Sequence, residues 1–377
     1  MGDAMSGSPP VTIPRADEAL RELAARDPKL PDLPLVLGAE RRNASLGFST
    51  VLERLRYKPG ASVVAALRAD DGSRLWVVSY SDPVKLNKTV RRAERAGAET
   101  LPLTAHTLAG PAHADRLLSR TVTRLFGQQA PVFGGADLIR YNPLRRLVLR
   151  EGSRALKITA SAQTRAPAVA RALAGRGLSL IVPEHVVGNC WASGWWGDGD
   201  LSFKGGAGPA RQAGAALAGI HGTPCAQLEL PVLDAAAIAR TAAAAITTLL
   251  PALRERVEAL STRLSGLGEG SSPVLAHGDW SADQALTDGR EVRIIDLDRA
   301  TLAPREYDLG TYLACGGDPA LLDGYREAGG RVDDRTLPGW QALAHVQRAA
   351  EPFLHGDAVW PRGIERAVAR AEEVSPT

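Results

Sequence analysis

The chain has 377 residues, a formal net charge of +3 at pH 7 and a hydrophobic content of 45%, which is enough for two or three compact units around a large buried core. Its charge is nearly balanced, and it has no Lys- or Arg-rich run with interleaved aromatic residues, which argues against a nucleic-acid partner. Its 3 cysteines lie far apart, at positions 190, 225 and 315, which argues against a disulfide framework and against a zinc site.

The N-terminal segment is polar and broken by prolines, and it lacks the apolar core of a signal peptide. No later segment has the length and apolarity of a membrane-spanning helix. We therefore expect a soluble cytoplasmic protein that binds neither a membrane nor nucleic acid. The sequence leaves the oligomeric state open.

Two stretches of the chain share a short pattern. Each has an Arg-Tyr-x-Pro segment, then a Gly-Ser-Arg turn and a helix-like segment, at 56–59, 72–74 and 90–97 in the first stretch and at 140–143, 152–154 and 169–177 in the second. In this alignment Val77 takes the position of Lys157. The pattern indicates an internal duplication, with coincidence as the alternative because the match is short.

The second stretch reads as three short strands within residues 140–158. Lys157 lies between apolar neighbours in the third strand, where an ammonium group is costly to bury unless an anion contacts it. A nucleotide phosphate is one such anion, and the alternative is a lysine on the solvent face of an edge strand. The turn that carries Arg145 and Arg146 could also approach phosphates through guanidinium and backbone N–H groups.

The helix predicted from Gln163 to Gly175 has no acidic residue to pair with Lys157, so Glu184 or another acid would have to replace that partner. The Trp-rich segment 189–209 is expected to contain a strand, and its tryptophans either line a cleft or pack in the core. A long amphipathic helix is predicted from Asp234 to Leu264.

The segment 277–300 carries the most specific pattern in the chain. Asp279 is followed five residues later by Gln284, and Asp288-Gly289 is a hairpin signal between two apolar runs. Asp296 ends the second run and is expected to face back toward the loop. Two carboxylates and a carbonyl-bearing side chain in this order meet the needs of phosphoryl transfer. The alternative is a polar hairpin that carries aspartates by chance.

This segment resembles the aminoglycoside phosphotransferase and choline kinase-like family, whose signature is HGD-x-x-x-x-N followed by a hydrophobic strand that ends in Asp. The segment YDLG at 307–310 is similar to the family's next motif, although Asp308 is also a good helix N-cap. Gln284 stands where the family has Asn, as it does in the maltokinase branch. A cap before the kinase unit is also similar to the maltokinase arrangement.

The resemblance implies an α+β, protein-kinase-like two-lobe fold. It would comprise an N-terminal cap at 1–129 that could be a degenerate repeat of the small lobe, a small lobe at 130–197 and a helical large lobe at 198–377. The implied reaction is Mg²⁺-dependent transfer of the γ-phosphate of ATP or GTP to a hydroxyl group of a small molecule such as an aminoglycoside or a sugar.

The resemblance also implies a role for each motif residue. These roles are a catalytic base at Asp279, metal ligands at Asp296 and Gln284, and nucleotide contacts at Lys157, Arg145 and Arg146. His277 is expected to fix the loop through hydrogen bonds and His221 to be structural. A second His-Gly-Asp at 355–357 is expected to play no catalytic part, because no strand ending in a metal-binding Asp follows it.

Two other functions stay open. The cap and the missing helix acid are compatible with a Ser/Thr kinase-like subunit that acts on a precursor peptide in lanthipeptide biosynthesis. Gln284 and the missing acid are also compatible with a pseudokinase scaffold that has no turnover.

Overall fold

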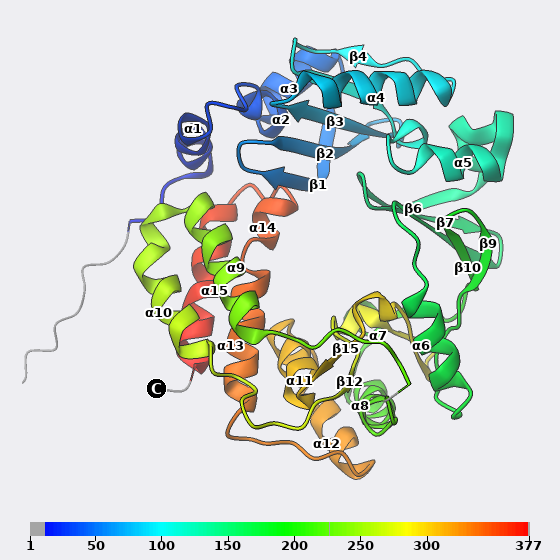
Figure 1. Cartoon of the computed structure of the whole chain (residues 1–377), viewed down its shortest axis with the longest axis vertical. Coiled ribbons are helices and arrows are strands. Elements are labelled where there is room, and N and C mark those ends of the chain that lie inside the picture. The colour runs from blue at the N-terminus through cyan, green and yellow to red at the C-terminus, as the bar shows by residue number, and fades with distance from the viewer. Residues whose placement is uncertain (1–11, 226, 376–377) are drawn as a thin grey trace, which may run out of the picture.

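The computed structural model describes residues 12–225 and 227–375, and Figure 1 shows how their helices and strands are arranged. Within these residues, two five-stranded sheets lie beside a mainly helical body that also holds a three-stranded and a two-stranded sheet. Buried apolar side chains form one cluster between the first sheet and the helices, one inside the helical body and one shared by the two large sheets.

The first sheet has the strand order β1-β2-β3-β5-β4. Its strands are β1 (Thr50–Lys58), β2 (Ser62–Ala69), β3 (Arg74–Tyr80), β4 (Leu101–Pro102) and β5 (Thr107–Pro111). The helices before the sheet are α1 (Ala16–Arg26), α2 (Leu33–Leu37) and α3 (Ala39–Leu46), and the helix after its third strand is α4 (Pro83–Arg95). The helix expected at 90–97 therefore begins earlier, where Asp82 caps it by accepting from Val84 N.

The second sheet has the strand order β6-β7-β8-β10-β9, which repeats that of the first. Its strands are β6 (Asp137–Asn142), β7 (Arg146–Glu151), β8 (Arg154–Thr159), β9 (Glu184–Val187) and β10 (Cys190–Gly194). The preceding helix is α5 (Ser119–Phe126), and the helix after the third strand is α6 (Arg165–Ala174). The three predicted strands and the predicted helix are confirmed.

The two sheets also share a buried hydrogen-bond pattern. In each, an aspartate upstream of the sheet accepts from a tyrosine near the end of the first strand and from an amide in the next turn. The bonds to Asp27 come from Tyr57 Oη (2.7 Å) and Gly60 N (2.9 Å), and those to Asp115 come from Tyr141 Oη and Leu144 N (2.8 Å each). Both turn residues have positive φ, 66° at Gly60 and 57° at Leu144. Such a repeated arrangement is what an internal duplication predicts.

The strand register identifies the counterpart of Lys157. In the second sheet the first turn closes at the Asn142–Arg146 pair, and Val148 faces Lys157. In the first sheet the same turn closes at Lys58–Ser62, and the equivalent pair is Val64–Val78. The counterpart is therefore Val78, and the expected Val77 is wrong by one residue. The Gly-Ser-Arg alignment slips because the β2–β3 turn is longer than the β7–β8 turn.

The helical body contains the C-terminal part of the chain. Its helices are α7 (Leu201–Lys204), α8 (Ala207–His221), α9 (Ala235–Leu249), α10 (Arg254–Leu264), α11 (Arg305–Ala314), α12 (Ala320–Glu327), α13 (Leu337–Arg348), α14 (Glu351–Leu354) and α15 (Trp360–Val374). Its strands are β11 (Gly199–Asp200), β12 (Val274–Ala276), β13 (Ala285–Thr287), β14 (Val292–Ile294) and β15 (Thr301–Ala303).

The prediction of one helix from Asp234 to Leu264 is wrong. The chain turns at Leu250, and α10 starts after a short 3₁₀ turn at Pro251–Leu253. Proline has no N–H to donate, and its ring clashes with the preceding helical turn. The apolar periodicity continued across the break because α9 and α10 both contribute to the same buried cluster.

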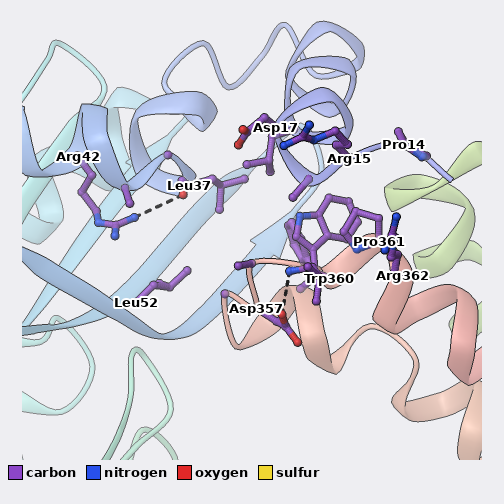
Figure 2. Close-up of a pocket in the computed structure, with 18 of the residues that line it drawn as sticks. Pro14, Arg15, Asp17, Leu37, Arg42, Leu52, Asp357, Trp360, Pro361 and Arg362 are labelled. Carbon is purple, nitrogen blue, oxygen red and sulfur yellow. Dashed lines mark hydrogen bonds between the residues drawn. The ribbon is translucent and has the colours of Figure 1, made fainter.

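The N-terminal cap packs against the C-terminal helices. Leu55 and Val63 of the first sheet share a buried cluster with Leu343 of α13 and Ile364 of α15. Figure 2 shows a cavity of about 810 Å³ at this junction, with Trp360 on one side of it and Arg42 on the other. A common core therefore ties the cap to the helical body, while the predicted domain boundaries near residues 129 and 197 stay predictions.

Candidate active site

A cavity of about 680 Å³ lies between the second sheet, α6 and the loop at 283–298. The polar side chains that line it include Arg146 and Lys157 from the sheet, and Gln284, Asp296 and Asp298 from the loop. Cations from one lobe therefore face carboxylates from the other. A volume of this size is typical of a small-molecule or cofactor site.

Three tryptophans also line this cavity: Trp191, Trp195 and Trp196. The guanidinium carbon of Arg150 lies 4.5 Å from the ring centre of Trp195, and that of Arg293 lies 4.4 Å from the ring centre of Trp196. These cation–π contacts hold the rings at the cavity wall. Of the two predicted placements, the structure shows the one in the cleft.

The loop after β12 depends on a glycine. Gly278 has φ of 84°, a conformation that L-residues with side chains rarely adopt. A Cβ built at Gly278 would lie 1.9 Å from the backbone oxygen of Arg299. The glycine thus allows the loop that presents Asp279 to pass directly against the segment that follows Asp296.

Asp308 anchors this loop from α11. It is fully buried and accepts from His277 N at 2.6 Å and Gly278 N at 2.9 Å, and His221 Nε2 lies 3.1 Å from it. Burial acts to raise the pKa of Asp308, but the hydrogen bond from His221 and nearby positive charge outweigh it and hold the pKa below its ordinary value. The N-cap prediction for Asp308 is wrong, because α11 begins at Arg305 with Pro304 before it.

Both expectations for the two histidines agree with the geometry. His277 Nε2 lies 2.8 Å from the carbonyl oxygen of Ile295, which links the two ends of the hairpin motif. His221 Nδ1 lies 2.8 Å from Tyr325 Oη, while its other nitrogen faces Asp308. Both rings are buried, so they position the loop rather than face the cavity.

The hairpin is confirmed, and it places Asp296 in the cleft. Strands β13 and β14 pair with Ala285 opposite Ile294, and Asp296 follows with φ of 62°. A non-glycine residue in this conformation is uncommon and is found preferentially at functional sites. Asp296 Oδ1 lies 2.9 Å from Lys157 Nζ, and its Oδ2 lies 3.0 Å from Arg146 Nη1.

Asp298 is the acid that pairs with Lys157 in place of the missing helix acid. Its Oδ2 lies 2.6 Å from Lys157 Nζ, whereas Glu184 is exposed on β9. Burial and the neighbouring Asp296 raise the pKa of Asp298. Burial also acts to raise the pKa of Asp296, but Lys157 and Arg146 outweigh it and hold that pKa well below its ordinary value.

The donor set in the cleft fits a magnesium ion. Asp296 and Asp298 offer carboxylate oxygens, and the largely buried Gln284 lines the same cavity with an amide group. Mg²⁺ prefers such oxygen ligands and completes its shell with phosphates and water. Among the described residues there is no cluster of three or more His, Cys, Asp or Glu side chains suited to a metal, so these ligands alone would not form a closed metal cage.

The surroundings of Asp279 differ from those of Asp296. Of the residues described, it is not among those that line the 680 Å³ cavity. Its Oδ1 lies 3.5 Å from Arg299 Nη1 and 3.5 Å from Arg348 Nη1. The sequence places Arg299 directly after Asp298, where a contact to phosphates or to water is expected, and it does not predict that Arg299 or Arg348 contacts Asp279. Arg348 comes from α13 and has no local signal that could have indicated it.

Arg145 and Arg146 have different places in the structure. Arg146 lines the cavity and pairs with Asp296. Arg145 is exposed, and burial of part of its side chain and the charges of Arg299 and Arg56 lower its pKa. Arg145 does not line the cavity, and it lies close both to Arg299 and Arg56 and to the cavity residues Arg146 and Asp298.

Comparison with known proteins agrees with this site. Residues 201–346 match the model of the phosphotransferase enzyme family, a segment that includes Asp279, Gln284 and Asp296. Among curated protein sequences, none matches the chain. The match confirms the resemblance to phosphotransferases that the 277–300 segment predicted.

Solved structures of phosphotransferases are also similar to the chain. A choline/ethanolamine kinase family protein from Mesorhizobium loti is 19% identical, with a TM-score of 0.51 over 69% of this chain and 95% of that chain. An AMP-bound spectinomycin phosphotransferase is 17% identical, with a TM-score of 0.47 over 63% and 92%. A GDP-bound aminoglycoside 2'-phosphotransferase-IIIa is 17% identical, with a TM-score of 0.48 over 68% and 98%. The first likeness confirms the α+β kinase-like fold.

No helix in the described part of the chain is long and apolar enough to span a membrane.

Proposed function

We propose that the protein is a Mg²⁺-dependent phosphotransferase that moves the γ-phosphate of ATP or GTP to a hydroxyl group of a small molecule. The observation that carries this proposal is the cluster of Lys157, Arg146, Asp296 and Asp298 inside a cavity between two lobes. Phosphoryl transfer needs cations for the phosphates and carboxylates for the metal in one place. The match of residues 201–346 to a phosphotransferase family supports it.

Asp296 and Gln284 would hold the metal ion, which neutralises phosphate charge when it is bound. Lys157 and Arg146 form ion pairs with the Asp296 carboxylate in the present structure. In the nucleotide complex both would contact phosphate oxygens instead. Asp298 stays within reach of Lys157 and keeps its ammonium group directed into the cavity. These charge-assisted contacts would align the γ-phosphate and stabilise the charge that develops on it.

Asp279 would orient the acceptor hydroxyl and receive its proton. The backbone of its loop is fixed by Asp308 and by the close approach of Gly278 to Arg299, so the carboxylate needs no large rearrangement. Holding the reacting oxygen near the phosphorus atom converts an encounter between two molecules into a step within one complex. The two neighbouring arginines lie 3.5 Å from the Asp279 carboxylate and can also contact the acceptor.

The test is a nucleotide-consumption assay with Mg²⁺ across hydroxyl compounds, run on the wild type, Asp279→Ala and Asp296→Ala. The expected result is acceptor-dependent turnover by the wild type and a loss of about 100-fold or more in each variant. Thermal shifts with Mg²⁺–ATP separate binding from turnover. Equal background hydrolysis in all three proteins, with normal nucleotide binding, would favour the scaffold without turnover.

A further inference from the structure

The surroundings of Asp279 are strongly cationic. Arg299 and Arg348 each lie 3.5 Å from its carboxylate. Arg348 Nη2 also lies 3.1 Å from Glu351 at the start of α14. On the same helix end, His355 contacts Arg54 of β1. The guanidinium groups from the cap and from α13 are therefore joined to the catalytic loop by one series of contacts.

Further arginines from the second sheet reach the same region. Arg145 of the β6–β7 turn is exposed, and Arg140 of β6 is exposed and lines the 680 Å³ cavity. Burial lowers the pKa of Arg54, and the positive charges of Arg140, Arg145 and Arg146 lower it further, against an opposing effect of Glu351. Arg145 is in turn close enough to Arg299 and Arg56 for their charges to lower its pKa. Arg54 of the first sheet, Arg145 of the second sheet and Arg299 of the loop therefore lie near one another.

Acidic side chains only partly balance this charge. Of the described residues, Arg299 and Arg348 contact Asp279, Arg348 also contacts Glu351, and Arg54, Arg56 and Arg145 lie close enough for arginine charges to lower the pKa of Arg54 and of Arg145. The acids near these five arginines, apart from Asp298 that pairs with Lys157, are Asp279, Asp283 and Glu351. Lys157 and Arg146 are already matched by Asp296 and Asp298. Like charges held this close repel one another, so an anion that binds among them lowers the free energy of the region.

A cavity of about 560 Å³ opens next to Arg348. Its basic lining residues are His345, Arg348, His355, Arg366 and Arg370, and the acidic ones are Glu351 and Asp357. This volume is in the range of a small-molecule site and is too small for a folded partner. Cys315 also lines it, and the charge of Asp279 acts on the pKa of that thiol, so the cavity is near the catalytic loop.

We propose that the acceptor is a small hydroxyl compound that also carries a phosphate or carboxylate group, and that Arg54 and Arg348 bind this anionic group. The inference rests on the proposed function and narrows its acceptor. Guanidinium groups bind both anions through paired, charge-assisted hydrogen bonds. Positively charged acceptors such as aminoglycosides and choline would instead meet arginines at the approach to Asp279.

The transfer itself balances without another reactant. The acceptor oxygen forms a bond to the γ-phosphorus while the bond from that phosphorus to the β,γ-bridging oxygen breaks. The electron pair of the broken bond leaves with the nucleoside diphosphate, and the hydroxyl proton passes to Asp279. The anionic group of the acceptor takes no part in these bonds, so it acts in binding alone.

The experiment uses acceptor pairs that differ in charge. Turnover with Mg²⁺–ATP is measured for glycerol against glycerol 3-phosphate and glycerate, for glucose against glucose 6-phosphate and gluconate, and for the cations kanamycin and choline. The proteins are the full-length wild type, Arg54→Gln, Arg348→Gln, Arg348→Lys and Arg263→Gln. Arg263 is exposed on α10 and serves as the matched control.

The expected result is that, in at least one acceptor pair, the anionic compound is turned over faster than its neutral partner. Arg54→Gln and Arg348→Gln should raise the KM for that acceptor about tenfold, the effect of losing one hydrogen bond to a charged group. Arg348→Lys should recover part of the loss, and Arg263→Gln should match the wild type. The KM for ATP should stay the same in all of them, which separates the acceptor side from the nucleotide side. Comparing the phosphate-bearing acceptors with the carboxylate-bearing ones shows which anionic group the site binds.

A binding measurement keeps the proposal testable if the panel lacks the true acceptor. With Mg²⁺–ADP filling the nucleotide cavity, inorganic phosphate and 3-phosphoglycerate should raise the melting temperature of the wild type more than that of Arg54→Gln and Arg348→Gln. Equal shifts in the wild type and both variants overturn the inference, as does preferred turnover of a neutral compound or of kanamycin or choline. A wild type that fails to bind Mg²⁺–ATP overturns the proposed function, and with it the inference.

Discussion

The two five-stranded sheets share a strand order but differ at the positions that line the 680 Å³ cavity. They have the same strand order, a helix after the third strand, and an aspartate that accepts from a tyrosine and a turn amide. By the strand register, Ser62 in the first sheet stands for Arg146, and Val78 stands for Lys157. The aspartate–tyrosine bonds occur in both sheets, while the cations that pair with Asp296 occur only in the second.

The packing around each sheet explains why Lys157 and Arg146 have no cationic counterparts in the first sheet. Val78 packs in the apolar cluster that the two sheets share, where a lysine would have no anion to contact. The opposite face of the first sheet packs on the C-terminal helices. The first sheet is therefore packed on both faces, and its edge strand β1 carries Arg54 and Arg56.

The largest effect expected from this comparison is the loss of Lys157. Lys157→Met, which gives the second copy an apolar residue as in the first, should lower kcat/KM by about 100-fold or more, because the phosphates lose a preorganised cation. Lys88→Met on the exposed face of α4 is the control in the first copy and should match the wild type. Steady-state kinetics with Mg²⁺–ATP measure both, and equal loss in both variants would contradict the division of roles.

The shared aspartates should each stabilise their own copy. Asp115→Ala leaves three donors unsatisfied, from Leu117 N, Tyr141 Oη and Leu144 N, and should cost about 2 to 3 kcal/mol of unfolding free energy. Asp27→Ala leaves two and should cost about 1 to 2 kcal/mol. Urea unfolding compares them with Asp70→Ala at an exposed turn. If either aspartate variant were as stable as the wild type, the pattern would not be a common structural element.

Arg146 and Arg145 can be exchanged for the residues of the first copy, which are Ser62 and Ala61. Arg146→Ser should raise the KM for the nucleotide about tenfold, since the phosphates lose one guanidinium contact. Arg145→Ala should leave that KM unchanged and raise the KM for the acceptor, because Arg145 is close to Arg299 and Arg56. The opposite pattern, with Arg145→Ala affecting the nucleotide, would place Arg145 in the nucleotide cavity.

The smallest effects are on the pH dependence of stability, where two buried acids should differ in sign. The pKa of Asp308 is held below its ordinary 3.8, so its stabilising contribution is present above that pH and is lost as the pH falls through the folded-state pKa. Burial raises the pKa of Asp115, so its contribution is present at low pH and is lost as the pH rises through the folded-state pKa.

Urea unfolding between pH 3 and 7 measures both contributions. Asp308→Asn should make the free energy of unfolding less sensitive to acid, and Asp115→Asn should make it more sensitive. Parallel curves for the wild type and both variants would show that neither carboxyl group changes its pKa on folding.

Many elements of the fold, and the motif at 277–300, could be predicted from local sequence patterns. The hairpin at 284–295, the strands of the second sheet and helix α6 follow from alternation, turn residues and apolar spacing within short windows. The break at Pro251 was visible as a proline inside a helical pattern, but the periodicity on both sides concealed it. The offset between Val77 and Val78 shows how an insertion in a turn shifts a motif-based alignment.

The contacts that define the site lie far apart in the sequence. Asp298 pairs with Lys157 across 141 positions and Arg348 with Asp279 across 69, and no local pattern can indicate such partners. The acids on the loop could be identified from their spacing in the motif, and Lys157 from its position between apolar neighbours in a strand. Their pairing, and the arginines from the cap, required the packing of the two lobes.

The most direct test of the account is whether Asp296 holds a metal with the nucleotide. Electron paramagnetic resonance of Mn²⁺, used in place of Mg²⁺, should show a ternary complex with ATP and the wild type, and binding of Mn²⁺ weakened about tenfold or more in Asp296→Asn. Asp279→Asn, which changes the acceptor side, should bind Mn²⁺–ATP as the wild type does. Equal Mn²⁺ binding by the wild type and Asp296→Asn would contradict the account.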